Sequence, residues 1–287
     1  MEFNNKLFTM ERALFGSYGV SIADCAFESG ESAVKECTNV AAVRTDFRWK
    51  YPLWYCRGVK VEESKLSEGA RAGVWYTENA SFTDTPVLAP KCFRRCKGLT
   101  LENVDIPNAA ETLWNCEDVR LKNVNVKGDY FAMNCKRTEV DTLDLDGNYV
   151  FDGAEDLTIR NSKLITKDAF WNSKNVTVYD SYIKGEYLAW NSQNVTLIRC
   201  TIESLQGLCY IENLKLVDCK LINTSLAFEK SSVDAVFDEA DSVFDPKCGV
   251  IKANKIGNLV LSGKNETKIV CDNIYKITNE PDWSEIL

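Results

Sequence analysis

The chain of 287 residues contains no histidine. This absence removes the most common general base and the most common metal ligand of proteins. It excludes Ser–His–Asp and Cys–His catalysis, and it excludes histidine-based zinc sites. Any proton transfer by this protein must therefore use Asp, Glu, Lys, Tyr or Cys side chains.

The sequence also predicts neither a linker nor a targeting segment. Proline occurs only 6 times, and we find no low-complexity tract, so the sequence predicts one domain without an internal linker. There is no apolar run of roughly 18 residues and no basic region followed by an apolar one at the N-terminus. We therefore expect a cytoplasmic protein with reduced thiols and no membrane partner.

The chain is acidic, with a net charge of -8 and a pI of about 4.9. An acidic surface repels polyanions, which argues against nucleic acid or a pectate-like polymer as a partner. The hydrophobic fraction of 45% is enough to build a sizeable core.

A repeat of 19 to 20 residues runs through most of the chain. A fixed period of this length is the mark of a solenoid. Each unit starts with alternating apolar residues such as Val176 and Val178, which point the same way on a strand. After a short break, Ser181 and Ile183 point inward again, so each unit predicts two short strands. The clearest units are 156–164, 175–183, 194–202 and 213–221.

The break between the two strands is a column rich in Asn and Asp. These residues tolerate left-handed backbone and bond the neighbouring main chain, so we expect a ladder of turns. The column comprises Asp24, Arg44, Glu63, Asp84, Asn103, Asn123, Thr142, Asn161, Asp180, Arg199 and Asp218.

A third strand is expected in the rest of each unit, where every inner position is apolar. Three short strands in so few residues leave no room for a helix, and stacking such units builds three parallel sheets. We predict an all-β, right-handed, single-stranded parallel β-helix of about 10–11 coils. Residues 1–19 are expected to form an N-terminal cap, 20–234 the coils, and 235–287 irregular C-terminal coils or a cap. The inner column is Leu53, Val74, Phe93, Leu113, Ala132, Phe151, Phe170, Ala189, Leu208 and Ala227.

These units resemble the right-handed parallel β-helix superfamily that includes pectate lyases and polygalacturonases. Longer strings such as WKYPLWYC (49–56), GNYVFDGAEDLTIRNS (147–162) and KDAFWNSKNVTVYDS (167–181) look like an uncharacterised bacterial family, known as a domain of unknown function. The resemblance covers nearly the whole chain and implies the fold without an activity. The polygalacturonase arrangement of Asp residues plus a His has no counterpart here, and neither do the calcium carboxylates and catalytic Arg of the lyases.

An aromatic column follows the inner one directly. Planar aromatic faces stack on sugar rings, and exposed apolar stripes mark binding surfaces. We therefore predict substrate binding here, with packing inside the rod or a homo-oligomer interface as the alternatives. The predicted binding residues are Trp54, Trp75, Arg94, Trp114, Trp171 and Trp190, together with Arg71.

Carboxylates gather beside this column in the middle of the chain. A pair of them is what glycosidic cleavage needs, one as the acid and the other as nucleophile or base. The predicted catalytic residues are Asp129, Asp152, Asp168 and Glu186. Arg94 or Arg71 would help to bind an acidic group. The alternative is that these charges are solvated or paired at strand ends.

The cysteines also fall into columns. Cys56, Cys96, Cys116 and Cys135 alternate with Thr or Ser at equivalent positions, as do Cys25, Cys200 and Cys219. Replacement by Ser or Thr indicates a site for a small side chain, and the spacing does not match a zinc knuckle. We expect no metal and no cofactor. A second ladder of Asn side chains is predicted at the turns that follow the Trp column, formed by Asn115, Asn134, Asn172 and Asn191.

These patterns favour a β-helix that binds a neutral or weakly charged carbohydrate, with cleavage by a carboxylate pair as the catalytic extension. The alternative is a non-catalytic interaction protein whose Trp stripe is an oligomer interface. Whether the protein is an enzyme stays open at this point, and so does a sugar-modifying reaction other than hydrolysis.

Overall fold

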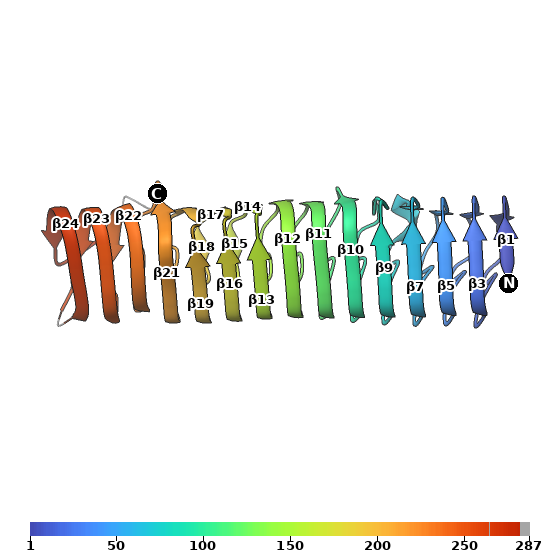
Figure 1. Cartoon of the computed structure of the whole chain (residues 1–287), viewed down its shortest axis with the longest axis horizontal. Helices are drawn as coiled ribbons and strands as arrows, with labels where there is room; N and C mark the ends of the chain where they lie inside the picture. Colours follow the sequence, from blue (N-terminus) through green and yellow to red (C-terminus); the bar gives the residue numbers. More distant parts are fainter. Residues whose placement is uncertain (264, 282–287) are drawn as a thin grey trace. The chain divides into compact units, whose positions relative to one another are not determined.

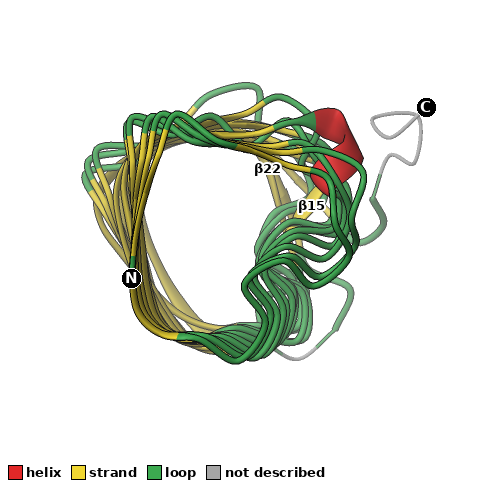
Figure 2. Ribbon diagram, turned by 90° about the vertical axis from the view of Figure 1, so that its right-hand side faces the viewer, coloured by secondary structure: helices red, strands yellow, loops and turns green. Residues whose placement is uncertain are grey.

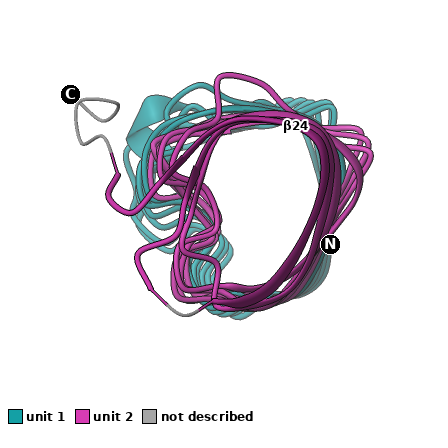
Figure 3. Cartoon of the chain, turned by 90° about the vertical axis from the view of Figure 1, so that its left-hand side faces the viewer, with its two compact units in different colours: residues 1–147 teal, residues 148–287 magenta. Residues whose placement is uncertain are grey.

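The structure is a computed structural model that describes residues 1–263 and 265–281. The chain divides into two compact units, Met1–Gly147 and Asn148–Leu287, which Figure 3 colours separately. Within each unit, successive turns of the chain pair as parallel strands (Figure 1). The only helix among the described residues is the 3₁₀ turn Glu68–Ala70.

In unit 1, eight strands form the main parallel sheet, and Val59 of one turn pairs with Ala80 of the next. They are β1 (Glu2–Asn4), β3 (Tyr18–Ala23), β5 (Thr38–Val43), β7 (Arg57–Glu62), β9 (Glu78–Thr83), β10 (Lys97–Ile106), β11 (Glu117–Lys127) and β12 (Lys136–Asp146). A second sheet consists of β2 (Leu7–Phe8), β4 (Ala26–Phe27), β6 (Asp46–Phe47) and β8 (Lys65–Leu66). In β10, β11 and β12, the first and second strands of a turn merge into one.

Unit 2 follows the same plan, and Val176 pairs with Val195. Its main strands are β13 (Glu155–Arg160), β16 (Lys174–Tyr179), β19 (Gln193–Ile198), β21 (Glu212–Leu221), β22 (Ser232–Phe244), β23 (Cys248–Val260) and β24 (Glu266–Thr278). The second strands of these turns are β14 (Lys163–Ile165), β17 (Tyr182–Gly185) and β20 (Thr201–Ser204). The third strands are β15 (Asp168–Ala169) and β18 (Tyr187–Leu188).

The predicted all-β parallel solenoid is confirmed, but the predicted number of coils is too low. The structure has about 15 turns instead of 10–11. At the N-terminus, β1 and β2 already make a paired turn within residues 1–19. Near the C-terminus the turns shorten, because the segment between one long strand and the next shrinks, to residues 245–247 between β22 and β23. Ser232 pairs with Cys248 and Cys248 with Glu266, so residues 235–278 do not keep the period of 19 that revealed the repeat.

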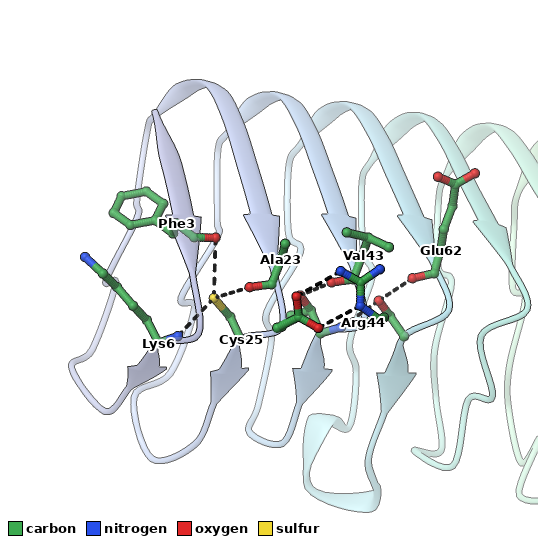
Figure 4. Close-up of polar contacts among 10 residues, drawn as sticks. Phe3, Lys6, Ala23, Cys25, Val43, Arg44 and Glu62 are labelled. Atoms are coloured by element: carbon green, nitrogen blue, oxygen red, sulfur yellow. Dashed lines mark hydrogen bonds and ion pairs between the residues drawn. The ribbon is translucent and has the colours of Figure 1, made fainter.

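The inner columns are buried as predicted, and the bend column adopts left-handed backbone throughout. Every predicted member has positive φ, from 45° at Arg44 to 61° at Thr142. The side chains bond along the column: Asn123 Nδ2 donates to Asn103 Oδ1 at 2.8 Å, and Arg44 forms a bidentate pair with Asp24 (Figure 4). Each bend therefore fixes its neighbour, as expected for short polar side chains in this conformation.

The third side of each turn departs from the prediction of a continuous sheet. It consists mostly of turns, drawn green in Figure 2, with isolated bridges such as Trp75 to Arg94. The cause is local: the inner residues Phe93, Leu113 and Ala132 have φ of 57°, 63° and 60°. A left-handed residue in each turn interrupts the strand, so the third sheet is reduced to fragments.

The cysteine columns carry hydrogen bonds. Cys116 Sγ donates to the carbonyl of Phe93 at 3.2 Å, and Ser173 Oγ donates to the carbonyl of Phe151 at 3.0 Å in the equivalent place. In the other column, Cys25 Sγ contacts the carbonyls of Phe3 and Ala23 (Figure 4). The described cysteines are all free thiols. The predicted small-residue positions thus satisfy main-chain carbonyls in the interior.

Candidate functional site

The aromatic column of unit 1 is a stack rather than an open platform. Trp54 and Trp75 lie face to face, with ring centres 5.0 Å apart and planes 7° from parallel. The indole N–H of Trp75 donates to the carbonyl of Lys91 at 2.8 Å, and that of Trp114 donates to the carbonyl of Tyr130 at 2.6 Å. The indoles thus use ring faces and N–H groups in contacts with neighbouring turns, and all three remain partly exposed.

Arg94 continues this stack. Its guanidinium carbon lies 5.0 Å from the ring centre of Trp75 and 4.4 Å from that of Trp114, so the cation is held between two indoles. It also donates to the carboxylate of Glu111, and this hydrogen bond lowers the pKa of Glu111. The guanidinium group of Arg94 is therefore bound by other side chains of unit 1, whereas Arg71 is exposed.

The aromatic cluster of unit 2 is less regular. Trp171 and Trp190 lie 5.6 Å apart at 37°, and Tyr187 meets Trp190 edge-on at 5.2 Å. Tyr210 contacts Trp190 from the following turn at 5.1 Å. Because these rings are tilted, they do not cover each other fully, and both indoles are partly exposed. Sequence reasoning did not single out Tyr187 and Tyr210, although they flank the Trp column at fixed offsets.

Asp152 occupies a position that indoles hold on other turns. The indole N–H of Trp190 reaches the carbonyl of Gln206, 16 residues later, as Trp75 reaches Lys91. Counting 16 residues from Asp152 leads to Asp168. A short carboxylate thus replaces the large ring that would otherwise cover the next turn. The backbone N–H of Trp171 donates to Asp152 Oδ1 at 3.1 Å.

The environment of Asp152 favours its protonated form. Burial raises the pKa of Asp152 to about 7, with a further contribution from the charge of Asp168, while the hydrogen bond from Trp171 acts in the opposite direction. A carboxyl group with a pKa near neutrality is able to donate a proton at physiological pH.

Asp168 lies on the next turn and has a relative exposure of 4%. Its Oδ1 atom is buried and has no hydrogen-bond partner. Burial raises the pKa of Asp168, Lys167 lowers it and Glu186 raises it. A buried carboxylate oxygen without a partner is costly, so this group favours either protonation or a polar ligand.

Of the four predicted catalytic carboxylates, Asp152, Asp168 and Glu186 belong to unit 2. The charge of Asp168 contributes to the raised pKa of Asp152, and the charge of Glu186 contributes to the raised pKa of Asp168. Glu186 is exposed and lies 3.6 Å from the ammonium group of Lys167. Asp129 is an exposed residue of unit 1.

Two other kinds of site are not found in the part of the chain that the structure describes. No group of three or more Cys, Asp or Glu side chains is placed to hold a metal ion. None of the described helices has the length and hydropathy needed to cross a bilayer.

Solved structures with a similar course include the surface protein and adhesin PfbA of Streptococcus pneumoniae. It shares 10% identity, with 96% of this chain and 81% of that chain covered and a TM-score of 0.29. The A-module of the mannuronan C-5 epimerase AlgE4 of Azotobacter vinelandii shares 8% identity, with 96% and 86% covered and a TM-score of 0.26. No curated protein matches the chain.

A family model does match. It is described as "Protein of unknown function (DUF3737)" and covers residues 1–274, which is nearly the whole repeat. The chain is therefore a member of the DUF3737 family.

Proposed function

We propose that the third face of unit 2 binds a neutral or weakly charged carbohydrate, and that Asp152 donates a proton to a glycosidic oxygen. The observation that carries this proposal is the carboxyl of Asp152, whose pKa is raised to about 7 at a position where other turns place an indole. A protonated carboxyl beside partly exposed aromatic rings is the arrangement that glycosidic cleavage requires of its acid.

The second carboxylate in this proposal is Glu186. Asp152 and Glu186 lie two turns apart, which corresponds to roughly 10 Å along the stack at the usual strand spacing. That spacing along the stack lies slightly above the range for inverting enzymes, roughly 6.5–9.5 Å, in which a water molecule fits between the two groups. Asp152 would protonate the leaving oxygen as the glycosidic bond breaks, while Glu186 accepts a proton from the attacking water.

Asp168 acts in this scheme through Asp152. Its exposure of 4% keeps it from reaching a substrate directly, but its charge helps to raise the pKa of Asp152. Asp168 is therefore a positioning residue, and Trp171 and Trp190 are the residues against which a sugar ring would pack.

The contacts within unit 1 favour a second candidate function, which concerns the aromatic column of that unit. Trp54, Trp75, Trp114 and Arg94 use their faces and polar groups within the unit. Packing is the role that these contacts support there, and the partly exposed surface of the column would serve protein association rather than sugar stacking. A non-catalytic interaction protein would have such a face.

A panel of neutral and uronate-containing oligosaccharides tests the proposal, with hydrolysis followed by chromatography and binding by Trp fluorescence. We expect Asp152→Asn to lower turnover at least about 100-fold while binding persists. Asp234→Asn, an exposed carboxylate on β22, is the matched control and should behave as the wild type. Turnover unchanged by Asp152→Asn would remove the catalytic part. Fluorescence unaffected by every sugar would favour the interaction protein.

A further inference from the structure

Two rows of asparagine side chains run along unit 2, and they end differently. In the first row, Asn213 Nδ2 donates to Asn194 Oδ1 at 3.0 Å, and Asn194 Nδ2 donates to Asn175 Oδ1 at 2.9 Å. Asn175 Nδ2 in turn donates to Asp156 Oδ1 at 2.8 Å. Each amide therefore donates to the side chain one turn earlier, and a carboxylate accepts the last of these bonds.

The second row ends at a glycine. Asn191 Nδ2 donates to Asn172 Oδ1 at 2.6 Å, which orients the Nδ2 group of Asn172 toward the preceding turn, as in the first row. The equivalent residue on that turn is Gly153, because the backbone N–H groups of Gly153 and Asn172 each donate to the carbonyl of the Trp on the following turn. Since glycine has no side chain, this position offers the exposed Asn172 amide no carboxylate or amide oxygen to bind.

The neighbouring indole, that of Trp171, differs from the others of its column. The indole N–H groups of Trp75, Trp114 and Trp190 donate to main-chain carbonyls 16 residues later. In the described part of the chain, no protein group accepts the indole N–H of Trp171, which is partly exposed. Asp152 holds the equivalent position on the preceding turn, so an indole covers Trp171 only from the side of Trp190.

We propose that one neutral pyranose ring binds in place of the indole that the turn of Asp152 lacks, and that Asn172 determines its specificity. This inference rests on the proposed function. The ring would pack on the face of Trp171 that no indole covers. Its hydroxyl oxygens would accept hydrogen bonds from the Trp171 indole N–H and the Asn172 amide, and its glycosidic oxygen would meet Asp152.

The charges at this position favour a neutral ring over a uronate. Both donors are uncharged, so they bind a hydroxyl oxygen without requiring a negative charge on the ligand. The carboxylate of an acidic sugar would lie beside Asp152, where the charge of Asp168 already acts against a second negative charge. An acidic sugar would therefore bind more weakly than its neutral counterpart.

Titration of the full chain with defined tetrasaccharides tests this inference without requiring turnover. The probes are maltotetraose, cellotetraose and mannotetraose, with tetragalacturonate as the acidic comparison, and ¹H–¹⁵N NMR follows the Trp171 indole and Asn172 amide resonances. We expect at least one neutral probe to shift both resonances and to bind at least about tenfold more tightly than tetragalacturonate. A wild type that binds no neutral probe at about 10 mM would overturn the inference.

Gly153→Asn places in this position the side chain that other turns carry there. Asn172 and Asn191 have φ of 53° and 57°, close to the 68° of Gly153, so the backbone accepts Asn. The new side chain would give the Asn172 amide an acceptor and occupy the place of the sugar. We expect at least about tenfold weaker binding of the neutral probe, with an unchanged midpoint of thermal unfolding.

Asn172→Asp removes the donor but keeps the acceptor for Asn191, and should weaken binding by a similar factor. Asn115→Asp, an exposed residue of the same column in unit 1, should bind as the wild type does. Wild-type affinity in Gly153→Asn or in Asn172→Asp would overturn the inference, even if Asp152→Asn abolishes turnover. Weaker binding in both, with turnover unchanged in Asp152→Asn, would remove the catalytic proposal and retain this sugar site.

Discussion

Asp152 and Trp171 hold equivalent positions on successive turns, and Asp152 Oδ1 accepts a 3.1 Å hydrogen bond from the backbone N–H of Trp171. The short side chain ties itself to the backbone of the next turn where an indole would extend further. Because a carboxyl replaces a ring here, an ionisable group lies where the charge of Asp168 raises its pKa. The functional proposal depends on this effect.

Asp152 should make stability depend on pH. Its folded-state pKa of about 7 lies above the unfolded value near 3.9, so the native state retains a proton that the unfolded state releases. The stability that this group contributes is present below about pH 4 and is lost as the pH rises to about 7. We expect the free energy of unfolding, relative to Asp152→Asn, to fall by roughly 2–4 kcal/mol over this range.

Chemical denaturation of both proteins at several pH values measures this difference, in which contributions from all other groups cancel. Asp234→Asn serves as the control for the loss of an exposed carboxylate. A difference that is constant from pH 4 to pH 8 would show that the Asp152 pKa is ordinary.

Substitutions in the bend column should be sensitive to backbone conformation. Asn123 has φ of 52°, which a β-branched residue adopts only with strain. We expect Asn123→Val to destabilise unit 1 by about 1–3 kcal/mol, since it also loses the bond to Asn103. Asn123→Gly loses the same bond without strain and should cost less. Thermal unfolding of the two variants compares these effects, and equal losses would argue against left-handed strain.

The thiol of Cys116 should be replaceable by a hydroxyl but not by a methyl group. Its Sγ donates to the carbonyl of Phe93, as Ser173 Oγ does to that of Phe151. We expect Cys116→Ser to retain the wild-type stability to within about 1 kcal/mol. Cys116→Val leaves the carbonyl of Phe93 without this donor and should cost about 1–3 kcal/mol. If Val is tolerated better than Ser in denaturation curves, the column is governed by hydrophobicity alone.

The cation between the indoles is expected to stabilise unit 1. Arg94→Met keeps much of the aliphatic length but removes two cation–π contacts and one of the two ion-pair partners of Glu111, the other being Lys91. We predict a loss of about 1–3 kcal/mol. Arg120→Met removes an exposed pair with Glu139 and should change stability by less than about 1 kcal/mol. Equal effects of the two variants would show that the stack around Arg94 adds nothing.

The columns were predictable because each position recurs at a fixed spacing and each needs one physical property. The bend at Asn103 and Asn123 requires a residue that tolerates positive φ, and the inner position at Leu113 requires an apolar one. The fragmented third sheet was not predictable, since apolar residues such as Phe93 rarely adopt left-handed backbone and carry no local signal for it.

The membership of the candidate site stays a prediction, and its geometry could not be predicted from the sequence. Asp152 and Asp168 stood out as carboxylates beside a Trp column. A side chain at this position faces the residue 16 places later, on the next turn. Only the indole hydrogen bonds of Trp75, Trp114 and Trp190 reveal this spacing. The short C-terminal turns escaped recognition because β22 and β23 follow a different period.

The most direct test of the functional account is a titration of the Asp152 carboxyl itself. With ¹³C-labelled aspartate and Asp152→Asn to assign the resonance, NMR follows the carboxyl carbon from pH 3 to pH 9. The account predicts an apparent pKa near 7 that falls in Asp168→Asn. A midpoint near 4, unchanged in Asp168→Asn, would contradict it.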